Sequence, residues 1–146
     1  MAKHAVNAAF NLCYFYFFHR NEFQKMINDD SLLEWAEFAG YKYGTPAIPV
    51  NSALNDGLNV LLEIEIAGAR QIRKIRPDAL LVFLQPPSFS ELEERIRGRG
   101  TEDEERIQAR LHLAQEEMAS AAEFDHILIN HRVDEIVEAL VALASS

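Results

Sequence analysis

The sequence has little of what several common classes of protein require. It contains one cysteine, Cys13, which excludes both an internal disulfide and a cysteine-rich metal site. Only 14 Lys+Arg stand against 23 Asp+Glu, and the formal net charge of −9 provides no basic surface for nucleic acid or an anionic membrane. We therefore expect a cytoplasmic chain with a reduced thiol and with neither a nucleic-acid nor a membrane partner.

No apolar run is long enough to cross a bilayer, which takes about 20 residues. The longest run, residues 5–18, is interrupted by Asn7 and Asn11, and no small-residue cleavage site follows it. Residues 14–18 are dense in Tyr and Phe, which favour the packed surfaces of β-strands. We expect residues 5–18 to form a buried strand rather than a targeting segment.

Glycine is also scarce. The six glycines never form the phosphate-binding sequence G-x-x-x-x-G-K-[ST], and Gly98-Arg99-Gly100 lacks the third glycine of a dinucleotide fingerprint. The histidines show no shared metal-ligand spacing, and His112 with Glu116, four residues apart, is expected to be a solvated pair. No nucleophile-elbow sequence is present either. Neither covalent catalysis nor a protein-held metal site is predicted.

What the sequence does contain is an alternation of helical and strand patterns. Helical spacing, with capping boxes at Ser88/Glu91 and Thr101/Glu104, predicts helices at 22–28, 50–55, 68–76, 88–98, 101–122 and 133–143. Alternating and continuous apolar runs predict strands at 59–66, 79–84 and 126–130. This order predicts an α/β fold with a parallel sheet and helical crossovers, in one domain.

Arginines and glycines gather at residues 95–101, and Arg110 follows on the next helix. Arginine presents a planar fork of donors that suits phosphate oxygens, and the glycines on both sides of Arg99 provide a hinge. Phosphoryl transfer needs such arginines, because the enzyme contributes mainly positioning and charge stabilisation. The alternative is that Arg95 and Arg97 pair with glutamates of the same exposed helix.

Three carboxylates have mainly apolar neighbours. Glu34 lies beside a tryptophan, and Glu63 and Glu65 share one face of the expected strand. Burial of a carboxylate is unfavourable unless the group is paired or binds a ligand. A guanine base has adjacent N1–H and N2–H₂ donors that one or two carboxylates can accept. An internal ion pair with Arg70 or Arg73 explains the sequence equally well.

Six blocks of the sequence occur in the order, and near the spacing, of the guanylate kinase family. They are 32–38, 43–46, 61–65 with 68–70, 86–88, 95–101 and 124–130. The chain resembles this family from about residue 14 to residue 144. The resemblance implies ATP-dependent phosphorylation of GMP to GDP with Mg²⁺, on a P-loop-kinase fold. It also implies one domain, 1–146, with a GMP-binding lobe at 14–57, a core at 58–146 and a lid at about 98–112.

The resemblance implies a GMP site. Glu34 and Glu65 resemble the carboxylates that read the guanine edge, and Thr45 resembles the hydroxyl beside them. Tyr43 resembles a tyrosine that contacts the GMP phosphate. Glu63, on the same face of the expected strand as Glu65, completes the GMP-binding set.

An ATP site and the catalytic arginines are implied as well. Arg95 and Arg99 resemble lid arginines that bind ATP phosphates, and Arg110 resembles the arginine that bridges the two substrates. Asn130 resembles an asparagine near the adenine. Mg²⁺ is expected to accompany ATP if the chain is active.

The chain departs from the family pattern at its start. The family begins with a strand, a Walker A loop and a helix, and residues 1–13 match none of them, so the expected fold is truncated at the N-terminus. Loss of one preorganised donor can lower a rate about 100-fold, and the Walker A loop supplies several donors. We expect impaired or absent turnover with GMP selectivity retained. The alternative is a non-catalytic guanylate-kinase-like binding or scaffold module.

The missing strand also leaves a sheet edge exposed in the expected fold. Residues 5–18 are expected either to replace that strand, or to leave the edge open so that two chains pair along it as a homodimer.

Overall fold

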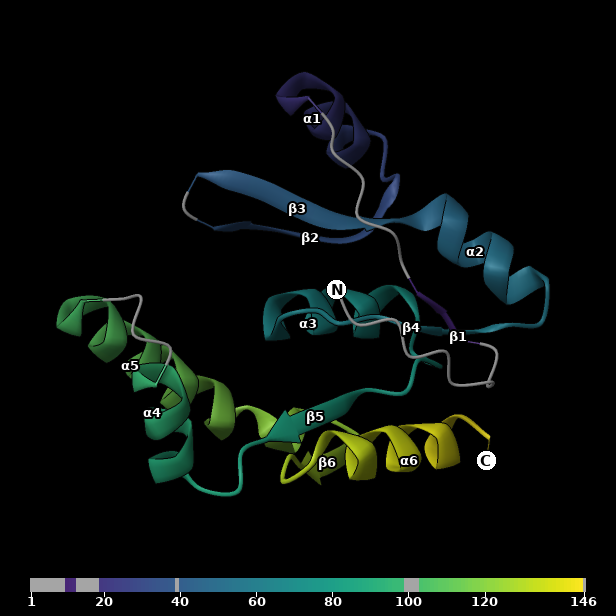
Figure 1. The fold of residues 1–146 in the computed structure, drawn as a ribbon. Coiled ribbons are helices and arrows are strands. Elements are labelled where there is room, and N and C mark those ends of the chain that lie inside the picture. Colours follow the sequence, from purple (N-terminus) through teal and green to yellow (C-terminus); the bar gives the residue numbers. More distant parts are fainter. Residues whose placement is uncertain (1–9, 13–18, 39, 99–102, 146) are drawn as a thin grey trace. The chain divides into compact units, whose positions relative to one another are not determined.

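In the computed structural model, helices alternate with short strands along the chain (Figure 1). The structure describes residues 10–12, 19–38, 40–98 and 103–145. The chain divides into two units, Met1–Ala79 and Leu80–Ser146. Each unit combines helices with a parallel pair of strands, so the class is α/β, as predicted. The division into a lobe at 14–57 and a core at 58–146 stays a prediction.

The first unit contains a parallel strand pair and an antiparallel hairpin among its helices. Its described elements are β1 (Phe10–Leu12), α1 (Arg20–Asn28), β2 (Leu32–Phe38), β3 (Tyr41–Pro46), α2 (Ala47–Asn55), β4 (Asn59–Leu61) and α3 (Ile66–Ile75). Strand β1 pairs with β4 in parallel, from Phe10 opposite Asn59 to Leu12 opposite Leu61. The described part of the run 5–18 is therefore a strand, and the rest of that run lies outside the described residues.

The hairpin of β2 and β3 carries most of the predicted GMP site. The two strands run antiparallel, with Glu34 opposite Thr45 and Ala36 opposite Tyr43. Gly40, with φ 80°, supplies the positive backbone angle that the connection between the strands requires. Figure 1 shows the hairpin between α1 and α3, and β2 contacts both helices. The sequence patterns did not predict this hairpin.

Polar contacts fix the flanking helices to the hairpin. On α3, the Gln71 side chain donates to the Trp35 carbonyl at 2.8 Å and accepts from the Trp35 N–H at 3.2 Å, as a neighbouring strand would. On the α1 side, Lys42 Nζ donates to Gln24 at 2.7 Å and lies 5.5 Å from the centre of the Trp35 ring. The apolar core of this unit consists of Phe23, Leu33, Val50, Ala53, Ala69 and Ile72.

The predicted strand at 59–66 is wrong beyond its first three residues. Strand β4 ends at Leu61, opposite Leu12, the last described residue of β1. The chain then runs irregularly to Glu65, which caps α3 with extended backbone (φ −77°, ψ 167°). Glu63 and Glu65 consequently lie outside any strand.

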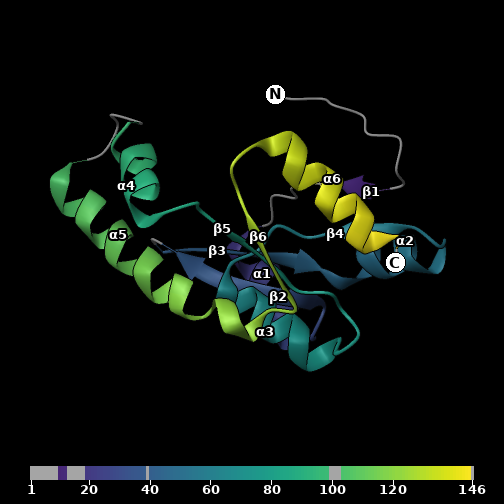
Figure 2. The same cartoon turned by 90° about the horizontal axis from the view of Figure 1, so that it is seen from below.

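The second unit is built around another parallel strand pair. Its described elements are β5 (Val82–Gln85), α4 (Phe89–Arg97), α5 (Glu104–Ala119), the 3₁₀ helix η1 (Ala121–Glu123), β6 (His126–Ile129) and α6 (Val133–Ala144). Strands β5 and β6 pair from Val82–His126 to Gln85–Ile129. The side chain of Asp125 accepts from the Leu81 N–H at 2.8 Å, which fixes this register. Figure 2 shows α4 beside α5, and α6 contacts β6.

The caps of α4 and α5 agree only partly with the prediction. Ser88 caps α4 and accepts from the Glu91 N–H at 3.1 Å, as predicted. Helix α5 is capped by Asp103, which accepts from the Arg106 N–H at 2.9 Å, and not by Thr101, which lies outside the described residues. Asp103 lies two residues closer to the helix than Thr101, and its carboxylate reaches the free N–H of Arg106 in the first turn. Ile96, Ile107 and Leu111 join the two helices in a buried cluster.

Within the described parts of the chain, no helix combines the length and the apolar character that crossing a membrane requires.

Candidate functional site

A buried carboxylate marks the candidate site in the first unit. Glu34, on β2, is only 4% exposed, although carboxylates are almost never buried without partners. Directly across the hairpin, Thr45 Oγ1 donates to Glu34 Oε1 at 2.6 Å. The strand register shifts between Leu32 and Glu34, and such an irregularity redirects side chains beside functional sites.

Burial is the main influence on the ionisation of Glu34. It raises the pKa of this carboxyl, the hydrogen bonds to Thr45 oppose the rise, and the charge of Glu65 adds to it. An arginine beside Glu34 would instead lower the pKa. The Arg73 Nη1 donates to the carbonyls of Pro77 and Ala79, at 3.3 and 3.2 Å. The causes that shift the pKa of Glu34 include no arginine, which does not support an ion pair as the explanation of this carboxylate.

The first turn of α3 lies against the same carboxylate. A Cβ atom added at Gly68, the third residue of the helix, would stand 2.7 Å from Glu34 Oε2. The first N–H groups of a helix have no partner within it, and this end carries a partial positive charge. The second oxygen of Glu34 therefore lies close to a helix end that favours the carboxylate.

Tyr43 and Glu65 extend the site. Tyr43 lies two residues from Thr45 on β3, so both side chains are on one face of the hairpin. The Tyr43 hydroxyl donates a hydrogen bond to the Glu65 carboxylate. Burial first, and then this bond and the charges of Glu65 and Glu34, raise the pKa of Tyr43 to about 12. This hydroxyl remains a donor at physiological pH.

The structure thus brings together four of the five predicted GMP residues. Glu34, Tyr43, Thr45 and Glu65 are joined by hydrogen bonds or charge interactions. Glu63 is exposed between β4 and α3, and within the described residues no hydrogen bond or ion pair connects it to the other four. The result is two carboxylates and two hydroxyls from β2, β3 and the start of α3. This arrangement can accept hydrogen bonds from adjacent N–H donors of a ligand.

In the second unit, two of the predicted ATP residues meet. Arg95 Nη2 donates to the Asn130 carbonyl at 3.1 Å and to Glu91 Oε2 at 3.2 Å. The Asn130 N–H donates to the carbonyl of Gln85 at 2.7 Å, immediately after paired β5 and β6. Arg95 is therefore held at the carboxyl ends of two parallel strands, where ligands of α/β folds bind. Its pairing with Glu91 also fits the alternative of an exposed helix pair.

The other two arginines of the predicted site are Arg110 and Arg99. Arg110 lies on α5 and is partly buried, and Arg99 lies outside the described residues.

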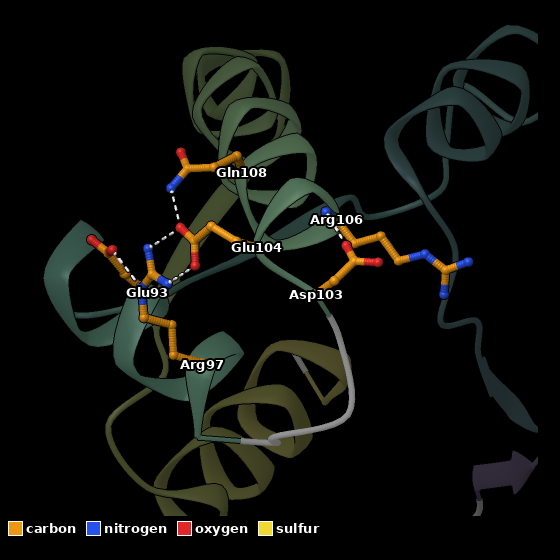
Figure 3. A network of polar contacts seen from close by, with 6 residues as sticks. All are labelled: Glu93, Arg97, Asp103, Glu104, Arg106 and Gln108. Atoms are coloured by element: carbon orange, nitrogen blue, oxygen red, sulfur yellow. Dashed lines mark hydrogen bonds and ion pairs between the residues drawn. The ribbon is translucent and has the colours of Figure 1, made fainter.

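Arg97, on α4, connects this helix to α5 through ion pairs. Its guanidinium donates to Glu93 at 2.8 Å and, through both terminal nitrogens, to Glu104 at 2.6 and 2.9 Å (Figure 3). Gln108 donates to the same Glu104 at 2.8 Å. Hydrogen bonds from Arg97 and Gln108 lower the pKa of Glu104 to about 2. For Arg97 the pairing explanation is confirmed.

The described residues contain no group of three His, Cys, Asp or Glu side chains that could hold a metal ion. His112 and Glu116 form an exposed pair at 3.5 Å, as predicted.

Two glycines in the site were not predicted to be functional. Gly68 lies against the carboxylate of Glu34, and a Cβ added at Gly44 would overlap the Glu34 carbonyl oxygen. A glycine inside a strand or helix can signal a close backbone approach, but it does not identify the neighbour.

Comparison with known proteins agrees with this architecture. The guanylate kinase family model matches residues 11–146. A guanylate kinase from Synechococcus sp. (strain CC9311) is 55% identical over 129 residues, which cover 88% of this chain and 66% of that protein. One from Thermobifida fusca (strain YX) is 51% identical over 132 residues, covering 90% and 67%. The crystal structure of guanylate kinase from Anaplasma phagocytophilum matches with a TM-score of 0.71 and 25% identity, covering 90% of this chain and 63% of that one.

The chain belongs to the guanylate kinase family. It spans about two thirds of the length of the relatives it matches.

Proposed function

We propose that the first unit binds GMP and that Glu34 reads its guanine base. The observation that carries the proposal is the burial of Glu34 beside Thr45, in a chain whose relatives are guanylate kinases. The ionised carboxylate would accept the N1–H and N2–H₂ donors of guanine, with Glu65 as the second acceptor. Desolvation of Glu34 would then be offset by hydrogen bonds from the ligand.

Tyr43 would contact the phosphate of GMP. Its raised pKa keeps the hydroxyl protonated, and a protonated hydroxyl can donate to a phosphate oxygen. In the structure the Tyr43 hydroxyl donates its hydrogen bond to Glu65. On GMP binding, a phosphate oxygen would replace Glu65 as the acceptor. Glu63 remains a candidate contact because of its position two residues before Glu65.

The second unit would supply the groups that bind ATP. Arg95 and Arg99 are proposed to contact the ATP phosphates, Arg110 to bridge the substrates, and Asn130 to lie near the adenine. The contact between Arg95 and the Asn130 carbonyl supports a shared site for these two residues. Mg²⁺ would arrive with ATP and supply charge neutralisation at its phosphates.

Transfer of the phosphoryl group by these 146 residues is proposed to be slow. They contain no G-x-x-x-x-G-K-[ST] sequence, so they do not supply the usual phosphate cradle and its lysine. Guanine recognition does not depend on that loop, because Glu34, Thr45 and Glu65 lie in the hairpin and at α3.

Nucleotide selectivity tests the proposal. GMP should raise the melting temperature of the chain, AMP should not, and IMP, which lacks the N2 amino group, should have an intermediate effect. Equal shifts from GMP and AMP would contradict guanine recognition. Stabilisation by a phosphorylated peptide, with none by GMP, would instead favour the binding-module alternative.

Turnover is tested by a coupled assay with ATP, GMP and Mg²⁺. The wild-type chain should show no more activity than the variants Glu34→Ala and Arg99→Ala, which report any contaminating kinase. Activity that disappears in both variants would contradict slow transfer and would mean that a phosphate cradle is supplied by other means.

A further inference from the structure

The carboxylate of Glu34 has little room to move, because the residue is buried and one of its oxygens is hydrogen-bonded. Oε1 is fixed by the 2.6 Å hydrogen bond from Thr45, and the side chain is 4% exposed. Strands β2 and β3 also approach closely here, since a Cβ added at Gly44 would overlap the carbonyl oxygen of Glu34. Little freedom is left for the carboxylate to avoid a new neighbour.

On the other side, only the absence of a side chain at position 68 leaves room for Oε2. An added Cβ would stand 2.7 Å from Oε2, 3.3 Å from Cδ and 3.4 Å from Cγ of Glu34. The first of these distances is well inside van der Waals contact, and the others show an approach along much of the side chain. A methyl group at position 68 would therefore displace the carboxylate or push α3 away from the hairpin.

Backbone conformation does not explain the glycine. Position 68 is the third residue of α3, and no positive φ requires glycine there. Inside a helix, alanine is more favourable than glycine by about 1 kcal/mol. The helix alone would thus favour alanine, and the neighbouring carboxylate is the feature that opposes it.

We propose that Gly68 is a positioning residue for guanine recognition, because its missing side chain lets Oε2 of Glu34 lie against the first turn of α3. The consequence for GMP rests on the proposed function of the site. Reading two adjacent donors requires both carboxylate oxygens in place, so a small displacement affects both hydrogen bonds.

Gly68→Ala tests the positioning role in GMP binding, and Ala67→Gly is the matched control. The control changes backbone freedom in the same helical turn at an exposed residue. By isothermal titration calorimetry, Gly68→Ala should weaken GMP binding about tenfold or more and lower the ratio of GMP to AMP affinity. Ala67→Gly should leave that ratio unchanged. If Gly68→Ala binds GMP as tightly as the wild type, the positioning role is wrong, while the proposed function stands.

A second measurement separates the inference from GMP binding altogether. Gly68→Ala is compared in the wild-type chain and in a Glu34→Ala background by thermal unfolding. With Glu34 present, the substitution should lower the melting temperature or leave it unchanged. In the Glu34→Ala background, it should raise the melting temperature by a few degrees, because only the gain in helix propensity remains.

The change in sign of the melting-temperature shift distinguishes failure of the positioning role from failure of the proposed function. A wild-type chain that binds no GMP would refute the proposed function, and the reversal would still show that Gly68 positions Glu34. The same melting shift in both backgrounds would overturn the positioning role, whatever the result with GMP. The Glu34→Ala background also covers the case in which Gly68→Ala alone does not fold.

Discussion

At the scale of single residues, the account depends on the environment of Glu34. Its carboxylate is buried, accepts from Thr45 and lies against the start of α3. Burial of such a carboxylate in apolar surroundings without partners would destabilise the fold. A bound guanine would supply the hydrogen-bond donors that offset this desolvation. Burial raises the pKa of Glu34, so the neutral form favours the folded state. The ionised form is the one proposed to accept from guanine, and stability and GMP binding should therefore respond to pH in opposite directions.

Without ligand, ionised Glu34 should destabilise the fold. Because its folded pKa is raised above the ordinary 4.5, its favourable contribution is full below 4.5 and is lost as pH rises through the raised value. We expect Glu34→Gln to be more stable than the wild type at pH 7, by about 1 kcal/mol. That advantage should shrink toward pH 4.5. Urea unfolding of both proteins across this range measures the difference, and a constant difference would contradict the interpretation.

The side chain of Thr45 should contribute to stability through its hydroxyl. Thr45→Val keeps the shape but leaves Glu34 Oε1 without its 2.6 Å donor, which should cost about 1–3 kcal/mol. It should also raise the pKa of Glu34 further, since the bond from Thr45 lowers that pKa. Thr45→Ser retains a hydroxyl and is the matched control. Chemical denaturation that finds equal stability for the two variants would contradict the role of this bond.

At the scale of elements, local signals predicted the helices well. Helix α1 at Arg20–Asn28 and α6 at Val133–Ala144 lie within two residues of the predicted limits, because apolar spacing and caps are local properties. The end of β4 was not predicted, since the apolar alternation of the sequence continues past Leu61 to Ile66. The hairpin was missed because residues 32–38 do not alternate strictly between apolar and polar, which is the local signal of a strand.

The candidate site was predictable in its residue types but not in its contacts. Glu34 was singled out as a carboxylate beside a tryptophan, and it is the residue that the structure buries. Glu63 was grouped with Glu65 on a strand face that does not exist, so its prediction lost its geometric basis. The role of Gly68 depends on an approach from β2, which sequence spacing does not reveal.

The α4–α5 pair is stabilised by the Arg97 network, which is solvent-exposed and should be sensitive to salt. Arg97→Lys replaces a two-pronged contact with Glu104 by a single ammonium group. We expect a lower melting temperature at low ionic strength and a smaller difference at high ionic strength. Arg106→Lys is the control, because Figure 3 shows its side chain directed away from Glu104. Equal melting temperatures for Arg97→Lys and Arg106→Lys at both ionic strengths would contradict this account.

The network should also weaken in acid. With the pKa of Glu104 lowered to about 2, its contribution is present above the ordinary 4.5 and is lost as pH falls toward 2.

At the scale of the whole molecule, the predicted site residues divide between the two units. Glu34, Tyr43, Thr45, Glu63 and Glu65 belong to the first unit, and Arg95, Arg99, Arg110 and Asn130 to the second. The net charge of −9 does not favour anionic nucleotides in general, so binding must depend on local donors such as these arginines. Under the proposed function, guanine recognition by Glu34 and Glu65 and binding of the ATP phosphates by Arg95 and Arg99 would depend on residues of different units.

The most direct test of the central claim is a calorimetric titration of GMP into the wild-type chain and into Glu34→Gln at pH 7. Glutamine keeps the shape of the side chain but replaces one acceptor oxygen by a donor NH₂, which opposes the guanine donors. The account predicts saturable binding to the wild type and at least about tenfold weaker binding to Glu34→Gln. Equal affinities for the two proteins would show that Glu34 does not read guanine and would contradict the account.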